Sequence, residues 1–162
     1  MNVGVVVYSW SGHTLSVAEK LTEKLSAAGH SVELLKVQVV GERKQGARDF
    51  QLDTLPDIGR FDGLVFGAAV EAFSLSSVLI AYLKSVESLQ GKKVACLATQ
   101  QFPYPWMGGN RAISQMKKLC KAKGATIVGS AVVNWAKSKR EKTTADAVDR
   151  LSGLFQVAPA AQ

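Results

Sequence analysis

Residues 3–14 read VGVVVYSWSGHT, and this stretch decides the fold class. Its first half, residues 3–8, is a continuous apolar run, which is typical of a parallel strand that is buried on both faces. Its second half is a short polar loop around Gly12, and a segment with helical spacing begins directly after it at Leu15. The stretch therefore predicts a buried strand, a tight loop and a helix in succession.

The loop between these two elements has the composition of a phosphate site. A helix N-terminus offers unpaired N–H groups and the positive end of the helix dipole, and both attract anions. Gly12 allows the backbone to approach a ligand closely. Helix capping would account for one of the three hydroxyl side chains in the loop, but not for all of them. We therefore expect a phosphate to be held, without a lysine, by Ser9, Trp10, Ser11, Gly12, His13 and Thr14.

The rest of the chain alternates strand patterns with helical patterns. The later strands are expected at 32–37, 63–68, 93–99 and 125–133. The helices are expected at 15–28, ended by Gly29, at 78–86, at 110–123, capped by Asn110, and at 145–155. No confident element is predicted between 38 and 60. Five strands separated by helices favour an α/β fold of three layers around a doubly wound parallel sheet. Ligands of such sheets bind beyond the carboxyl ends of the strands, so loops 68–76 and 99–110 are expected to share one site with the first loop.

Two motifs carry a resemblance to a known family. The spacing Ser-x-Ser-Gly-x-Thr directly after the first strand resembles the phosphate-loop signature of the flavodoxin family, and residues 61–67 (FDGLVFG) are similar to that family's third strand. The likeness covers nearly the whole chain and is best to the broad flavodoxin-like group. It implies a sheet of order 2-1-3-4-5, FMN as the cofactor, and second and third loops that flank the isoalloxazine ring. One domain is expected over 1–156, with a frayed tail over 157–162.

The second loop departs from the family pattern. The resemblance assigns to the cofactor site Ala69, Val70, Glu71, Ala72 and Phe73. Relatives often carry Tyr or Trp where this chain has Glu71, so Phe73 is a candidate replacement, although it also fits a core position. Glu71 itself is expected to be exposed to solvent rather than catalytic. Because residues 68–74 contain no Gly, the loop is expected to resist positive φ angles, which favours two-electron over one-electron chemistry.

The third loop is long and aromatic. The residues expected to contribute to the site are Thr99, Gln100, Gln101, Phe102, Tyr104, Trp106, Gly108, Gly109 and Asn110. Flat aromatic walls suit a flavin or quinone ring, and Pro103 and Pro105 would stiffen the loop. Gly108 and Gly109 would allow the backbone to approach the ring oxygens closely. The alternative is a surface loop that packs on its own side chains.

The distribution of charge is uneven. The net charge is +7, and residues 1–99 hold ten basic and ten acidic side chains, whereas residues 100–162 hold ten basic and three acidic ones. This asymmetry predicts an acidic redox partner or an anionic ligand, and a solvated basic face is the alternative. Cys96 and Cys120 are expected to be buried thiols of a cytoplasmic protein. We expect no signal peptide, no membrane span, no metal site and no nucleic-acid partner.

Three function classes remain. The first is an FMN-binding redox protein that transfers electrons between partners. The second is an FMN-dependent reductase of a quinone or similar acceptor with NAD(P)H, and the third is a flavodoxin-fold binding module without a cofactor. A phosphate-accepting receiver domain, a low-molecular-weight phosphatase and a dinucleotide-binding domain are disfavoured. The chain lacks their paired acids, their Cys loop and their G-x-G-x-x-G motif at the required positions.

Overall fold

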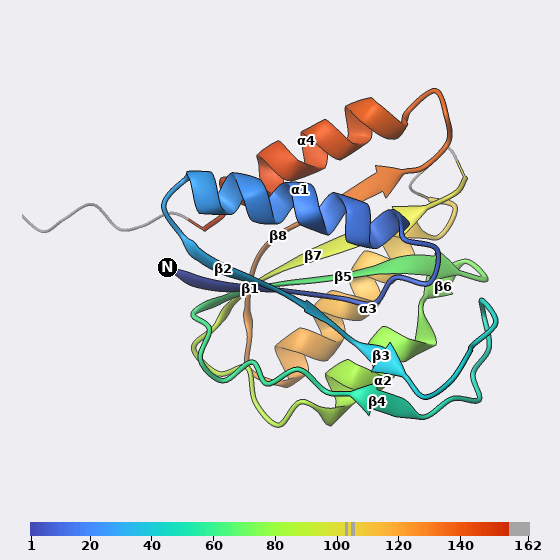
Figure 1. Ribbon diagram of the computed structural model, residues 1–162, viewed down its shortest axis with the longest axis horizontal. Helices are drawn as coiled ribbons and strands as arrows, with labels where there is room; N and C mark the ends of the chain where they lie inside the picture. The colour runs from blue at the N-terminus through green and yellow to red at the C-terminus, as the bar shows by residue number, and fades with distance from the viewer. Residues whose placement is uncertain (103, 105, 156–162) are drawn as a thin grey trace, which may run out of the picture.

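A parallel sheet forms the middle layer of the protein (Figure 1). The computed structural model describes residues 1–102, 104 and 106–155. The five parallel strands are β1 (Asn2–Val7), β2 (Ser31–Lys36), β5 (Gly63–Glu71), β7 (Lys93–Gln100) and β8 (Thr126–Asn134). Their spatial order is β2-β1-β5-β7-β8, which is 2-1-3-4-5 when only these strands are counted. The predicted fold class and strand order are therefore confirmed.

Two helices cover each face of the sheet (Figure 1). The helices α1 (His13–Ala27) and α4 (Arg140–Ser152) pack together on one face, and α2 (Ser77–Ser85) and α3 (Gly109–Ala122) pack on the other. The helix α1 ends as predicted, because Gly29 adopts a φ of 96° and the N–H of His30 bonds back to the carbonyl of Leu25. Because β1, β5 and β7 run parallel, the loops that follow them lie at one end of the sheet.

Two predicted helix starts are wrong. Asn110 is not the cap of α3, because the helix is preceded by Gly108 with a φ of 119° and already includes Asn110. A Cβ at Gly108 would lie 2.6 Å from Val70, so only glycine fits this crowded position. The helix α4 begins at Arg140 rather than at residue 145. Its first turn carries no apolar side chain, and the apolar spacing that reveals a helix in sequence starts only later.

The region without a predicted element contains a small antiparallel pair. Strands β3 (Gln38–Val39) and β4 (Leu52–Thr54) pair with each other beside the main sheet. The N–H of Val40 donates to the carbonyl of Gln51 at 2.8 Å. Residues 41–51, which we call the 41–51 segment, connect the two strands across the carboxyl end of the main sheet.

The strand β5 runs beyond its predicted end into a tight hairpin. It pairs antiparallel with β6 (Ser74–Leu75), and Ala72 and Phe73 connect the two strands with φ angles of 49° and 61°. The prediction that a loop without Gly resists positive φ is therefore wrong. Positive φ at both connecting residues is typical of a type I′ hairpin turn, and strand pairing offsets the local strain.

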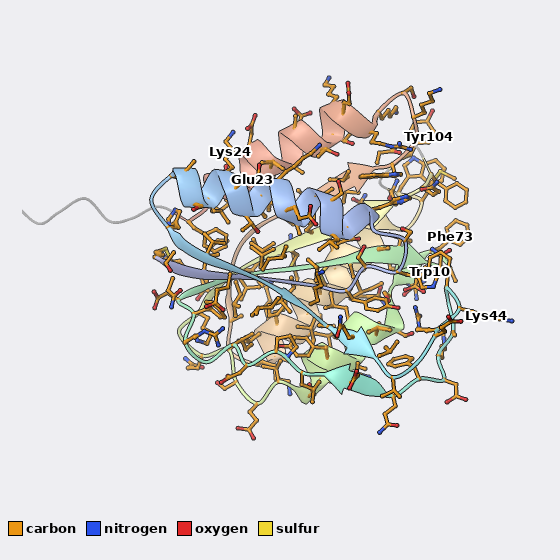
Figure 2. The ribbon with its side chains drawn as sticks, viewed as in Figure 1. Trp10, Glu23, Lys24, Lys44, Phe73 and Tyr104 are labelled. Atoms are coloured by element: carbon orange, nitrogen blue, oxygen red, sulfur yellow. The ribbon has the colours of Figure 1, made fainter. Side chains whose placement is uncertain are left out.

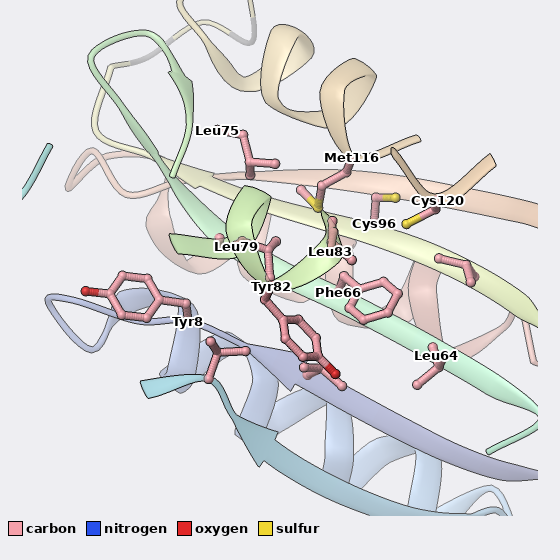
Figure 3. Packing of buried hydrophobic residues seen from close by; sticks show 14 of the residues in the cluster. Tyr8, Leu64, Phe66, Leu75, Leu79, Tyr82, Leu83, Cys96, Met116 and Cys120 are labelled. Atoms are coloured by element: carbon pink, nitrogen blue, oxygen red, sulfur yellow. The ribbon is translucent and has the colours of Figure 1, made fainter. Parts of the chain in front are cut away.

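The core consists of two apolar clusters, one on each face of the sheet. Figure 3 shows part of the cluster beneath α2 and α3, in which Phe66 from the sheet meets Tyr82 and Met116 from the helices. Cys96 and Cys120 lie in this cluster as buried free thiols, as predicted. The hydrogen bond with Cys96, together with burial, raises the pKa of Cys120, so this thiol stays protonated. Across the described residues, no helix is long and apolar enough to cross a membrane.

Candidate functional site

The three predicted loops meet around one cavity at the carboxyl end of the sheet. The cavity has a volume of about 220 Å³ and is lined by Trp10, Ser11, His13, Gln45, Ala69, Val70, Thr99, Gln100 and Gln101. Eight of these nine residues belong to the predicted site, and Gln45 was missed. Figure 2 shows Trp10, Phe73 and Tyr104 at this end of the molecule. The fold therefore brings together the loops that the sequence singled out.

The first loop presents unpaired backbone donors. Gly12 precedes α1 with a left-handed φ of 89°, and the hydroxyl of Ser9 accepts a hydrogen bond from the N–H of Leu15 at 3.2 Å. Within the described part of the chain, no group accepts a hydrogen bond from the N–H of the four residues Ser11, Gly12, His13 and Thr14. Such a curled loop at a helix N-terminus is arranged to bind an anion.

A buried pair of hydroxyl groups joins the first loop to the third. The Oγ1 atoms of Thr14 and Thr99 lie 2.8 Å apart, and both residues are buried. One hydroxyl donates and the other accepts, so each oxygen retains capacity for a further hydrogen bond. The pair ties the first turn of α1 to the end of β7.

His13 stacks on Trp135, which the sequence analysis did not single out. The ring centroids lie 4.3 Å apart with an interplanar angle of 16°, and the guanidinium of Arg140 lies over the Trp135 ring. Burial, followed by the positive charge of Arg140, lowers the pKa of His13 below its usual 6.5. The imidazole beside the cavity is therefore neutral at neutral pH. Trp135 follows the last strand, where no motif marks it.

Glu71 is buried, and the prediction that it is exposed is wrong. Its side chain is 4% exposed, and its carboxylate accepts hydrogen bonds from both Nη atoms of Arg43, at 2.9 and 3.4 Å. The backbone N–H of Gly46 donates to the same carboxylate. Arg43 and Gly46 come from the 41–51 segment, whose sequence shows no periodicity that could have revealed the contact.

Arg43 is the centre of a larger network. It donates to the Tyr8 hydroxyl, to the Ala47 carbonyl and to the Ser77 hydroxyl, and its own carbonyl accepts the indole N–H of Trp10 at 2.7 Å. Burial lowers the pKa of Arg43, but hydrogen bonds and charge from Glu71 and Tyr8 outweigh it, so the net shift is upward. Arg43 therefore keeps its positive charge beside the Glu71 carboxylate.

The side chain of Gln100 organises the third loop. Its Nε2 donates to the carbonyls of Phe102 and Tyr104, each at 2.6 Å, and its Oε1 accepts the N–H of Gly109 at 2.9 Å. Gln100 is 3% exposed. It was predicted as a cofactor residue, and the structure gives it this scaffolding position as well as a place in the cavity wall.

The aromatic side chains of the second and third loops lie outside the cavity, on its rim. Phe73 stacks on Phe102 at 5.4 Å, and Tyr104 stacks on Trp106 at 5.7 Å. Trp106 is 72% exposed, and the ammonium of Lys139 lies over the Tyr104 ring. The loop thus packs partly on its own side chains and still presents exposed rings. The predicted stiffening by Pro103 and Pro105 concerns positions outside the described residues.

Eight further predicted residues do not line the cavity, among them Ser9, Gly12, Thr14 and Glu71 of the first two loops. Ala72 is exposed in the hairpin connection. The close approach that Gly108 permits is to Val70 and Phe73 of the hairpin, and a Cβ at Gly109 would lie 2.3 Å from the Gln100 amide oxygen. Asn110 lines a different groove, of about 580 Å³, between α3, β8 and α4. No cluster of three potential metal ligands occurs among the described residues.

Comparison with known proteins identifies the fold. No family profile and no curated protein matches the chain. Flavodoxin 2 from Bacillus cereus is 20% identical, with a TM-score of 0.70 over 96% of this chain and 97% of that one. A short-chain flavodoxin associated with a PDU bacterial microcompartment is 16% identical, with a TM-score of 0.69 over 95% and 96% of the two chains. A flavoprotein from Lactobacillus acidophilus, solved in complex with FMN, is 18% identical, with a TM-score of 0.64 over 90% and 97%.

Proposed function

Because the chain has the flavodoxin-like fold, we propose that it is an FMN-binding redox protein that transfers electrons between partners. The observation that carries this proposal is the first loop, which has four unpaired N–H groups at the start of α1 and contributes Ser11 and His13 to the cavity wall. A phosphate monoester is the ligand class that such a loop suits.

The remaining residues fit a flavin nucleotide. The cavity volume of about 220 Å³ lies below the roughly 300–1,000 Å³ of usual small-molecule pockets, so the ligand would extend beyond it. The exposed rings of Trp10, Tyr104 and Trp106 on the rim supply flat apolar surface for that extension. An unpaired carboxylate at Glu71 would repel an electron-rich ring nearby. Arg43 pairs with this carboxylate and offsets its negative charge.

Each part of the site has a distinct task in this proposal. The first loop anchors the phosphate through its amides and hydroxyls. The lowered pKa of His13 keeps its imidazole neutral, so it adds no positive charge to this anchoring. Gln100 holds the third loop in place beside the cavity. The bound FMN would supply the electron-transfer chemistry. We place this protein in the cytoplasm, in keeping with its two reduced thiols.

A reductase of planar acceptors is the second candidate. The stacked pairs Phe73–Phe102 and Tyr104–Trp106 are exposed outside the cavity, where a quinone could lie against them. Oxidation of NADH or NADPH by the FMN-loaded protein in the presence of a quinone would support this function over simple electron carriage. A cofactor-free binding module is the third candidate, and it predicts that no flavin binds.

Calorimetry with FMN and riboflavin tests the main proposal. FMN should bind far more tightly than riboflavin, because the phosphate provides much of the anchoring. The visible spectrum of the purified protein reports whether flavin is retained. Equal affinities for the two compounds would refute the phosphate site, and absence of flavin binding would favour the cofactor-free module.

A further inference from the structure

We propose that the 41–51 segment is a fourth wall of the cofactor site and that the buried Arg43–Glu71 pair is the device that holds it there. The proposal rests on the function proposed above, since it assigns positioning residues to the same site. Neither Arg43 nor Gln45 belongs to the three loops that the fold normally brings to a ligand. The assignment therefore adds an element of this chain to the site.

Side chains, rather than backbone pairing, anchor the middle of this segment. The carboxylate of Glu71 binds the guanidinium of Arg43 and the backbone N–H of Gly46, so it grips the segment at two points three residues apart. Arg43 also donates to Ser77 at the start of α2 at 3.2 Å. The backbone contact between Val40 and Gln51 lies at the base of the segment and does not restrain its tip.

Gln45 connects the 41–51 segment to the cavity. It lies between the two anchored residues Arg43 and Gly46, and it lines the cavity together with Ala69 and Gln101. The indole N–H of Trp10 donates to the carbonyl of Arg43, which ties the phosphate loop to the same segment. Any change that frees Arg43 therefore displaces one wall residue and releases one side chain of the phosphate loop.

Breaking the Arg43–Glu71 pair is costly because both side chains are buried. The side chains of Arg43 and Glu71 are 2% and 4% exposed. Removal of one partner leaves the other as an uncompensated buried charge, which favours opening of the segment to water. Replacement of both by apolar residues avoids that charge while still deleting every polar contact of the pair. A single replacement both destabilises the protein and frees the 41–51 segment. The double replacement frees the segment without leaving a buried charge.

The first experiment needs no cofactor. Trypsin can cut after Lys44 and Arg48, both exposed in the 41–51 segment, and cleavage there reports opening of the segment. The variants are Glu71→Gln and the double variant Arg43→Met with Glu71→Leu. Glu42→Gln is the matched control, because it removes an exposed carboxylate from the same segment. We expect the first two to be cut at least roughly tenfold faster and the control to be cut like the wild type. Cleavage after Lys123, at the end of α3, reports global unfolding and is expected to change much less.

The second experiment measures dissociation of FMN from the same variants. We expect at least roughly tenfold faster release of FMN from Glu71→Gln and from the double variant, and no change for Glu42→Gln. Arg43→Lys keeps the charge beside Glu71 but lacks the forked donors, so a positioning role predicts that it resembles the double variant. If Arg43→Lys instead behaved like the wild type, neutralisation of Glu71 alone would be the role of Arg43, and the proposal would be overturned.

The two readouts keep the proposals separate. If the wild type binds no FMN, the proposed function fails, and the proteolysis still decides whether the pair holds the segment. If proteolysis rises while FMN release does not, the pair holds the segment but the segment is no wall of the site. If cleavage after Lys44 and Arg48 does not change in either variant, the positioning role is refuted.

Discussion

At the level of single residues, the hydroxyl pair of Thr14 and Thr99 separates ligand binding from structure. The two oxygens bond to each other at 2.8 Å, but only Thr14 belongs to the phosphate loop. Thr14→Val and Thr99→Val each break the pair and should lower the free energy of unfolding by about 1–3 kcal/mol, because a buried hydroxyl remains unpaired. Thr14→Val alone should also remove a donor to a charged ligand, which costs about 1.5–3 kcal/mol of FMN binding.

Calorimetric titration of the two variants with FMN distinguishes these effects. The dissociation constant should rise by roughly one to two decades for Thr14→Val, and clearly less for Thr99→Val. Urea unfolding of the unliganded variants supplies the matched stability values. Equal losses of affinity would mean that the pair only holds the two loops together and that Thr14 does not contact the phosphate.

His13 offers a titration that reports the ligand directly. Its pKa is lowered below 6.5 by burial and by Arg140. Below pH 6.5 the unfolded chain therefore binds more protons than the folded one. The stability that neutral His13 contributes is complete above pH 6.5 and is lost as the pH falls through the folded pKa. A bound phosphate should raise this pKa, because a nearby negative charge favours the imidazolium.

Proton NMR of the imidazole resonances can follow this shift. FMN should move the midpoint of His13 upward, whereas riboflavin, which lacks the phosphate, should leave it unchanged. His30 serves as the internal control, because it lies against the N-terminus and outside the loop. An unchanged His13 midpoint with saturating FMN would place the phosphate elsewhere.

At the level of the elements, the third loop depends on the side chain of Gln100. Gln100→Leu removes two donors and one acceptor, and leaves the carbonyls of Phe102 and Tyr104 without this partner. The buried N–H of Gly109 also loses its acceptor, and because an unsatisfied buried group costs about 1–3 kcal/mol, the free energy of unfolding should fall by about that amount. Gln101→Leu is the matched control, since its exposed side chain should change stability by only about 0.5 kcal/mol or less.

Urea denaturation followed by circular dichroism measures both free energies. Tryptophan fluorescence should also change in Gln100→Leu, because the loop carries Trp106. If Gln100→Leu were as stable as Gln101→Leu, the three hydrogen bonds of Gln100 would not hold the loop.

The elements that the sequence predicts well are those with local patterns. The strand β1 and its loop were predicted from one apolar run and one cluster of hydroxyls, and Gly29 was recognised as a helix stop. Glu71 was misjudged because its partner Arg43 lies 28 residues away in a segment without periodicity. The left-handed backbone at Ala72 and Phe73 was missed because it is imposed by strand pairing rather than by residue preference. Contacts across the fold therefore account for most of the errors.

At the level of the whole molecule, the basic side chains of residues 137–142 lie at the same end as the candidate site. They follow β8, and Lys139 reaches the ring of Tyr104 on the rim. Opposite charges attract over about 10 Å at an ionic strength of 0.1 M, and added salt screens them. A cationic rim should therefore accelerate encounters with acidic redox proteins, which we propose as partners of this protein.

A small anionic oxidant can probe this field before any partner is known. We expect the FMN-loaded, reduced protein to react with ferricyanide several-fold more slowly as the ionic strength rises from roughly 0.02 to 0.5 M, because screening weakens the attraction. Its reaction with neutral benzoquinone should hardly depend on salt.

Replacement of Lys137, Lys139 and Lys142 by Glu should abolish or reverse the salt dependence for ferricyanide. Replacement of Lys93, Lys121 and Lys123 by Glu changes the net charge by the same amount at the opposite end of the sheet, and should have a much smaller effect. If the two triple variants respond alike in stopped-flow measurements, the net charge rather than the rim guides the oxidant, and an acidic partner that docks at this rim loses its physical basis.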